Sequence, residues 1–144
     1  MPDRVSSRRS MAPAEKETLV LELVRELNRR PELVFVFLHG SFLVESTFRD
    51  LDLAVFVRAE SGNNQGFRDY EADLAVDLTL KARIPVDVRI LNDAPVGFRY
   101  HALKGRLLLA RDEDLLDEFR ARTWDDYCDF APFAREFLRG VLHG

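Results

Sequence analysis

The sequence predicts an α/β domain in which a small mixed β-sheet is flanked by helices and followed by a C-terminal helical segment. Two observations support this fold class. Apolar residues recur at helical spacing in several long segments, and short apolar runs rich in β-branched and aromatic residues lie between them, as strands do. The chain has 144 residues, 47% of them hydrophobic, which suits a single domain with a buried core.

Helices and strands are expected to alternate along the chain. We expect helices over residues 14–30 and 67–83, from Pro95 to Gly105, and over residues 112–142 with a kink near Pro132. We expect strands over residues 33–38, 51–57, 86–91 and 106–110. Residues 60–66 are dense in turn residues and are expected to form a loop.

Connection lengths indicate how the strands pair. Only residues 40–50 join the first two strands, so these strands are expected to be antiparallel or to be joined by a helix of one or two turns. A full helix precedes the third strand, which can therefore run parallel to a neighbour.

Composition limits the class of protein. Residues 1–13 hold arginines and serines without the apolar run of a signal peptide, and we expect a disordered extension before a single domain at residues 14–144. No apolar run approaches the roughly 20 residues of a membrane span. Cys128 is the only cysteine, which excludes an internal disulfide and fits a cytoplasmic location. The net charge of −4 argues against direct nucleic-acid binding.

Three aspartates interrupt the apolar strands. Asp50 and Asp52 share one face at the start of the second strand, and Asp87 lies within the third. If these strands are neighbours, three carboxylates converge, and cations must relieve their repulsion. Mg²⁺ prefers such oxygen ligands, and two ions suit a phosphoryl or nucleotidyl transfer. Taken singly, each aspartate also fits a strand-edge or surface role, with Asp87 paired to Arg89.

The first strand ends at Gly40 and Ser41. Glycine lets the backbone approach a ligand, and the N–H groups at a helix start favour phosphate. The alternative is an ordinary turn glycine followed by a capping serine. We expect His39, next to this turn, to be structural.

Together these motifs resemble the signature of the polymerase-beta-type nucleotidyltransferases, and in particular the minimal nucleotidyltransferases of prokaryotes. The resemblance covers residues 14–110 and rests on His39-Gly-Ser-Phe42, Phe48-Arg-Asp-Leu-Asp-Leu-Ala-Val55 and Val86-Asp-Val88. It implies a nucleotidyltransferase fold. The segment between the serine and the first acid is shorter than in most members, the usual early glycine is replaced by Val44 and Glu45, and Arg49 replaces the common serine.

The resemblance also implies roles for individual residues. Gly40, Ser41 and Arg49 would bind the nucleotide, and the three aspartates would be the catalytic acids that hold two Mg²⁺ ions on ATP. Arg49, Lys104 and Arg106 are the candidate cations for the leaving pyrophosphate, although each is also an ordinary surface charge.

Minimal nucleotidyltransferases are often antitoxins, and some transfer AMP from ATP to a tyrosine of a HEPN ribonuclease toxin. The resemblance thus implies a magnesium-dependent AMP transferase that forms a hetero-oligomer with such a toxin. Two alternatives stay open: an antitoxin that acts by binding alone, and a nucleotidyltransferase with a small-molecule acceptor. Phe133, Phe137 and Val141 recur at helical spacing and could offer a face to the partner.

Overall fold

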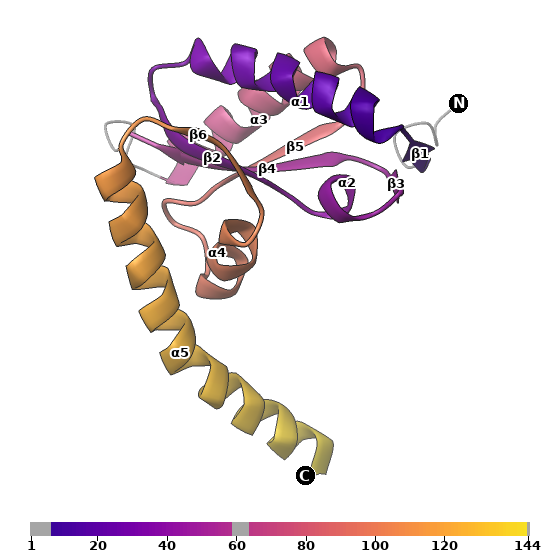
Figure 1. Cartoon of the computed structure of the whole chain (residues 1–144). Coiled ribbons are helices and arrows are strands. Elements are labelled where there is room, and N and C mark those ends of the chain that lie inside the picture. The colour runs from indigo at the N-terminus through magenta and orange to yellow at the C-terminus, as the bar shows by residue number, and fades with distance from the viewer. Residues whose placement is uncertain (1–6, 59–63, 144) are drawn as a thin grey trace.

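The computed structural model describes residues 7–58 and 64–143, and it places a four-stranded mixed sheet between two layers of helices (Figure 1). In chain order the elements are β1 (Arg9–Ser10), α1 (Pro13–Asn28), β2 (Leu33–His39), α2 (Ser41–Val44), β3 (Thr47–Phe48), β4 (Leu51–Val57), α3 (Asn64–Ala82), β5 (Val86–Ile90), α4 (Val96–Leu103), β6 (Arg106–Ala110) and α5 (Glu113–His143).

The sheet has the strand order β5-β4-β2-β6. Strand β2 pairs antiparallel with both β4 and β6, and β4 pairs parallel with β5. The expected antiparallel pairing of the first two strands is therefore confirmed, and the connection between them also holds the short helix α2. The long helix α3 provides the crossover that the parallel pair requires.

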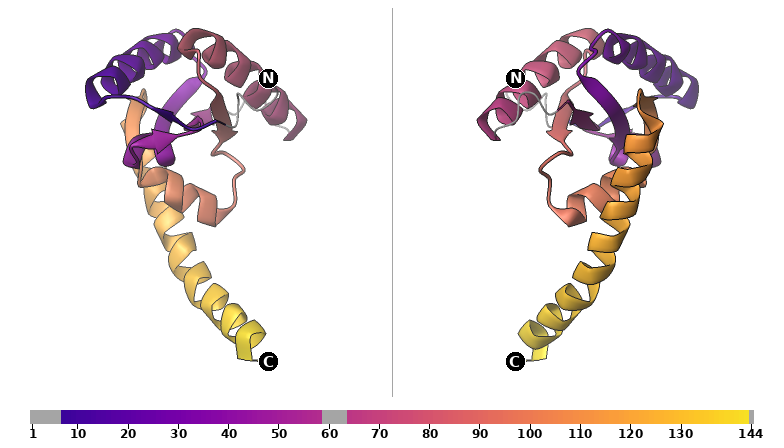
Figure 2. Two further views of the ribbon diagram at one scale, coloured as in Figure 1. Left: turned by 90° about the vertical axis from the view of Figure 1, so that its right-hand side faces the viewer. Right: turned by 90° about the vertical axis from the view of Figure 1, so that its left-hand side faces the viewer.

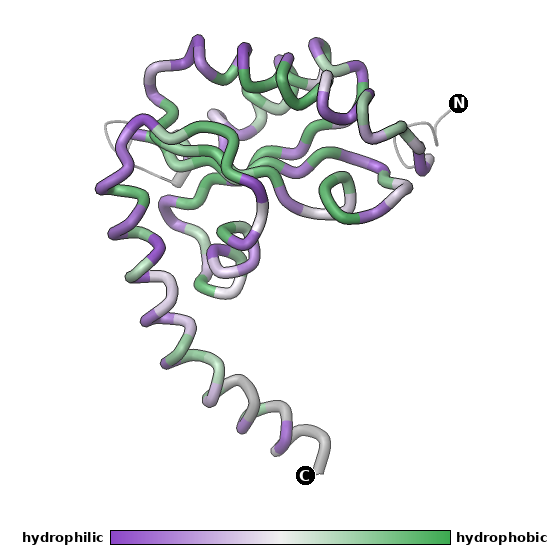
Figure 3. Tube along the Cα trace, in the orientation of Figure 1, coloured by the Kyte–Doolittle hydropathy of each residue, from purple (hydrophilic) through white to green (hydrophobic). Residues whose placement is uncertain are grey.

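Both faces of the sheet are covered (Figure 2). Helices α1 and α3 pack on the face that carries Val36 and Leu38, and α4 with the first half of α5 packs on the face of Phe35 and Phe37. Because side chains alternate along a strand, a strand that is buried on both sides reads as a continuous apolar run, and the hydropathy colouring shows such runs along the sheet (Figure 3).

The N-terminal segment corrects one expectation. Residues 1–6 lie outside the described residues, but Arg9–Ser10 form a strand with Thr47–Phe48 instead of a disordered extension. Arg8 reinforces this pairing, since its Nη2 donates to the Thr47 carbonyl at 2.6 Å. Such a contact between distant segments leaves no periodic signal in the sequence.

One further boundary differs from the prediction, whereas the helix predicted over residues 112–142 is confirmed as α5. Helix α3 already begins at Asn64, so the predicted loop is wrong for residues 64–66, and its residues 60–63 lie outside the described part. Helix α5 continues through Pro132 as one helix (Figure 1). In the described part of the chain, no helix is long and apolar enough to cross a membrane.

Candidate active site

The three aspartates meet at one end of the sheet. Asp52 of β4 and Asp87 of β5 are direct partners in the parallel register, and Asp50 immediately precedes β4. The inward neighbours Leu51 and Leu53 are buried among α1 and α3, so alternation turns Asp52 toward the opposite face, where α4 lies. The convergence predicted from the two strands is confirmed.

Burial and the crowding of carboxylates raise the pKa of Asp52. Burial, then the negative charges of Asp50 and Asp87 and a hydrogen bond with Asp50, together raise the pKa of its carboxyl from 3.8 to about 6. The ionised carboxylate at neutral pH is therefore destabilised in the folded protein, and a nearby positive charge would offset that cost.

The donor set fits a hard divalent cation. Within residues 7–58 and 64–143, no three acidic, histidine or cysteine side chains form a ready-made metal cage. Mg²⁺ does not need one, because it keeps several waters and binds through one or two carboxylates plus substrate phosphates. Asp50 and Asp52 offer half-buried carboxylates and Asp87 an exposed one, and every resolved influence on the pKa of Asp52 raises it, as expected where no positive charge lies close by.

Gly40 connects the turn after β2 to the aspartate cluster. Its φ of 85° and ψ of −166° lie in a region almost reserved for glycine. A Cβ atom at this position would collide with Asp52 Oδ2 and lie 3.1 Å from Asp52 Cγ. The turn and the carboxylate are therefore in close contact, which only glycine permits.

A cavity of about 370 Å³ lies over this turn. Its walls come from the end of β2, from α2 and the residue that follows it, and from the end of α4: His39, Gly40, Ser41, Leu43, Val44, Glu45, His101, Lys104 and Gly105. Ser41 is half-buried at the start of α2. The cavity has the position expected for a bound phosphate chain, with a lysine at its edge.

The structure separates the three candidate cations. Lys104 lines the cavity. Arg106 instead donates to both carboxylate oxygens of Glu17, at 2.7 and 2.8 Å, and this pair lines a different cavity beside α1. Arg49 is exposed next to Asp50 and does not line the cavity over the turn. Lys104 alone of the three is placed to face a ligand there.

His39 belongs to the site more closely than the sequence indicated. It is the register partner of Asp52 on β2, and its ring packs edge-on against Phe98 of α4. Burial lowers the pKa of this imidazole, Asp87 opposes that shift and Arg89 adds to it. Among the described residues its Nε2 is one of three buried side-chain atoms without a hydrogen-bond partner, so a neutral polar atom is available beside the carboxylates.

Lys16 of α1 is a second residue that sequence reasoning missed. Its Nζ donates to the carbonyls of Phe42 and Glu45, each at 2.7 Å, and lies 5.0 and 5.3 Å from the ring centres of Phe42 and Phe48. These contacts fix α2, and with it the Gly40 turn, against the first helix. Helical periodicity places Lys16 only at the edge of an apolar stripe, so no sequence signal marks the role.

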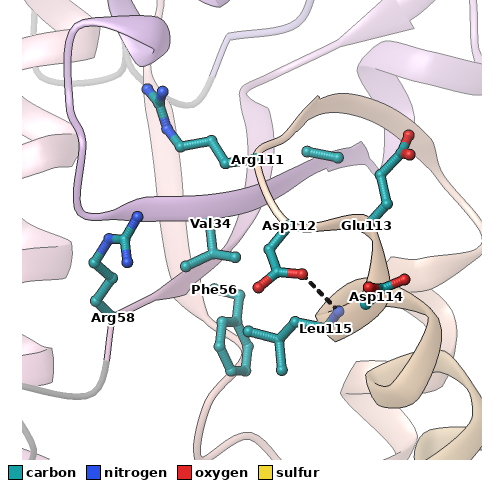
Figure 4. A pocket seen from close by; sticks show the side chains of 9 residues that line it. Val34, Phe56, Arg58, Arg111, Asp112, Glu113, Asp114 and Leu115 are labelled. Atoms are coloured by element: carbon teal, nitrogen blue, oxygen red, sulfur yellow. Dashed lines mark hydrogen bonds between the residues drawn. The ribbon is translucent and has the colours of Figure 1, made fainter.

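A larger cavity of about 880 Å³ opens at the opposite end of the sheet, between β2, β4 and the start of α5 (Figure 4). Its polar groups serve the fold: Arg111 donates to the carbonyls of Leu33 and Asn28, and Asp112 accepts a hydrogen bond from the Leu115 N–H at 3.0 Å. None of the three aspartates lines either cavity, but the smaller one includes Gly40, which contacts Asp52, whereas this one lies at the far end of the strands.

Comparison with known proteins agrees with this geometry. Residues 22–114 match the family model described as Polymerase beta, Nucleotidyltransferase. Among curated proteins, no sequence matches this chain.

Solved structures show the same fold. A chain in the complex of tri-AMPylated Shewanella oneidensis HEPN toxin with MNT antitoxin is similar with a TM-score of 0.68 and 18% identity, over 88% of this chain and 98% of that one. A crystal structure of the toxin–antitoxin MntA-HepT gives the same four values. A toxin–antitoxin structure with AMP-PNP gives 0.67 and 22%, over 88% and 98%. The resemblance inferred from the motifs, and the fold that it implied, are confirmed.

Proposed function

This chain belongs to the polymerase-beta nucleotidyltransferase family, and on that premise we propose that it is an antitoxin that transfers AMP from ATP to a tyrosine hydroxyl of a HEPN-type toxin. The observation that carries the proposal is the contact between the Gly40 turn, which lines a cavity of about 370 Å³, and Asp52 of the carboxylate cluster. The similar structures that contain an AMPylated toxin and AMP-PNP support the choice of ATP and of a protein acceptor.

Different residues of the chain would bind the triphosphate, neutralise the leaving pyrophosphate and hold the metal ions. The turn at Gly40 and Ser41 would hold the triphosphate with backbone N–H groups, and Lys104 would neutralise the pyrophosphate as it leaves. Asp50, Asp52 and Asp87 would hold two Mg²⁺ ions, which supply charge neutralisation on the phosphates.

The transfer itself is a displacement at the α-phosphorus. The acceptor oxygen forms a bond to the α-phosphorus, the bond from that phosphorus to pyrophosphate breaks, and the hydroxyl proton passes to the carboxylate of Asp87. Positioning and charge neutralisation account for most of such catalysis. Because ATP is the proposed substrate, we expect the protein to act in the cytoplasm together with its toxin.

The decisive experiment uses the HEPN-type protein that we expect in the neighbouring gene. That protein is incubated with this chain, ATP and Mg²⁺, and its intact mass is measured. The proposal predicts additions of AMP that disappear with Asp52→Asn and persist with Asp73→Asn, which removes an exposed carboxylate on α3.

Each alternative has its own outcome in this experiment. Toxin neutralisation that persists in Asp52→Asn without any mass change would mean an antitoxin that acts by binding alone. Transfer of AMP to a small hydroxyl compound, with the toxin unmodified, would mean a small-molecule acceptor. Either result overturns the proposed function.

A further inference from the structure

Helix α5 leaves the domain part of the way along its length. Its first half packs Leu116 and Phe119 into the core against the sheet, and Thr123 is also buried. The helix still contacts α4 through Asp126 and Tyr127. Beyond these residues it projects away from the sheet and from the other helices, as all three ribbon views show (Figures 1 and 2).

The apolar stripe of α5 continues where the domain ends. Phe130, Phe133 and Phe137 lie on the same side of α5 as Phe119, whereas Trp124 and Tyr127 lie against Tyr100 of α4. Five aromatic residues thus follow Phe119 on this helix. They are Trp124, Tyr127, Phe130, Phe133 and Phe137, which we call the α5 arm. The side chains of Trp124, Phe130, Phe133 and Phe137 are 55%, 43%, 70% and 63% exposed. A contiguous row of exposed aromatics, unlike scattered ones, indicates an interaction surface.

The arm begins next to the active site. Tyr127 stacks on Tyr100 of α4 with ring centres 3.7 Å apart and planes 3° from parallel, and Trp124 lies 6.0 Å from the same ring. Lys104, which lines the cavity over the Gly40 turn, places its Nζ 4.5 Å from the centre of Tyr100. An aromatic path therefore connects the arm to the phosphate cavity.

The charge of α5 restricts the partner. Helix α5 holds eight acidic side chains and four arginines, and all but one of the acidic side chains precede Phe130. A second copy of this helix would bring like charges together, whereas a cationic surface around an apolar groove would complement both features. A protein that cleaves RNA must present such cationic surface to the phosphate backbone.

We infer that the α5 arm is the docking surface for the toxin, and that it holds the acceptor hydroxyl at the mouth of the active site. This inference rests on the proposed function. Because the arm contacts the acceptor protein away from the reacting atoms, its contribution is to acceptor binding and appears in KM for the toxin.

The test is the double variant Phe133→Ala/Phe137→Ala, which keeps the helix because alanine is the best helix former. Its matched control is Val76→Ala/Leu80→Ala, two exposed apolar residues of α3 that are 58% and 73% exposed. KM and kcat for AMP transfer are measured by intact mass, with toxin affinity and ATP affinity measured separately. We expect the arm variant to raise the Kd and KM for toxin at least about tenfold, as the loss of two interface aromatics does, with kcat and ATP affinity unchanged.

The outcomes separate this inference from the proposed function. If the unaltered chain binds the toxin but transfers no AMP, the proposed activity fails, and the affinity of the arm variant still decides the docking. If the arm variant binds and modifies the toxin like the control, the docking inference is overturned. It is also overturned if the unaltered chain is a dimer that the arm variant dissociates, because the occupant is then a second copy.

Discussion

Replacing Asp52 by asparagine is expected to stabilise the metal-free protein at neutral pH and to leave its stability unchanged in acid. The folded carboxyl has a pKa of about 6, against 3.8 for an unperturbed group. Below pH 3.8 both folded and unfolded chains are protonated here, and the group has no effect on stability. Between pH 3.8 and 6 the unfolded chain ionises first, so the free energy of unfolding falls as pH rises, and the full penalty persists above pH 6.

The size of the effect follows from that difference in pKa. Two pH units correspond to about 3 kcal/mol, and solvent screening of this half-buried group reduces the penalty to about 1–2 kcal/mol. At pH 7.5 Asp52→Asn should therefore raise the melting temperature by roughly 3–6 °C for a domain of this size. Asparagine can also donate a hydrogen bond to Asp50, which the ionised aspartate cannot.

The assay is urea unfolding in EDTA at pH 4 and pH 7.5. Asp73→Asn serves as the control, because its exposed carboxylate on α3 should change stability by less than about 0.5 kcal/mol at either pH. An equal effect of Asp52→Asn at both pH values, or a loss of stability at pH 7.5, would refute the proposed crowding of carboxylates.

Four further predictions concern the site. Gly40→Ala should cost about 1–3 kcal/mol of stability and abolish ATP binding in a titration, while Gly97→Ala, where a Cβ meets nothing within 4 Å, should leave both unchanged. Lys16→Met should lower the unfolding free energy by about 1–3 kcal/mol and raise KM for ATP, because α2 loses two hydrogen bonds; an unchanged KM would contradict a positioning role. Lys104→Met should lower AMP transfer at saturating ATP, whereas Arg106→Met should not, as its partner is Glu17. Chelation by EDTA should stop AMP transfer, and added Mg²⁺ should restore it.

Several features of the fold were predictable because they follow from local pattern. Alternation along β4 placed Asp52 on the face opposite Leu51 and Leu53, and the short connection after β2 favoured an antiparallel pairing of β2 with β4. The full helix before β5 allowed the parallel pairing that sets Asp87 beside Asp52. The candidate acids and the Gly40 turn could therefore be named from residue type and spacing.

Contacts between separate elements were not predictable in this way. The pairing of Arg9–Ser10 with Thr47–Phe48 replaced an expected disordered segment. Arg106 looked equivalent to Lys104 in the sequence, but it pairs with Glu17 and does not line the cavity over the Gly40 turn. Lys16 of α1 donates a hydrogen bond to the carbonyl of Phe42 in α2, 26 residues away. Sequence spacing carries no information about such a contact.

The sequence by itself determined the order of the strands and helices, the face of each aspartate and the family, because periodicity and motif spacing are properties of the linear chain. Only the tertiary structure decided which cation lines the cavity. It also brought Asp52 into contact with the Gly40 turn and raised the pKa of its carboxyl, and it left the aromatic residues in the second half of α5 exposed beyond the core. These features depend on burial and on distances between residues from different elements, and packing alone sets both.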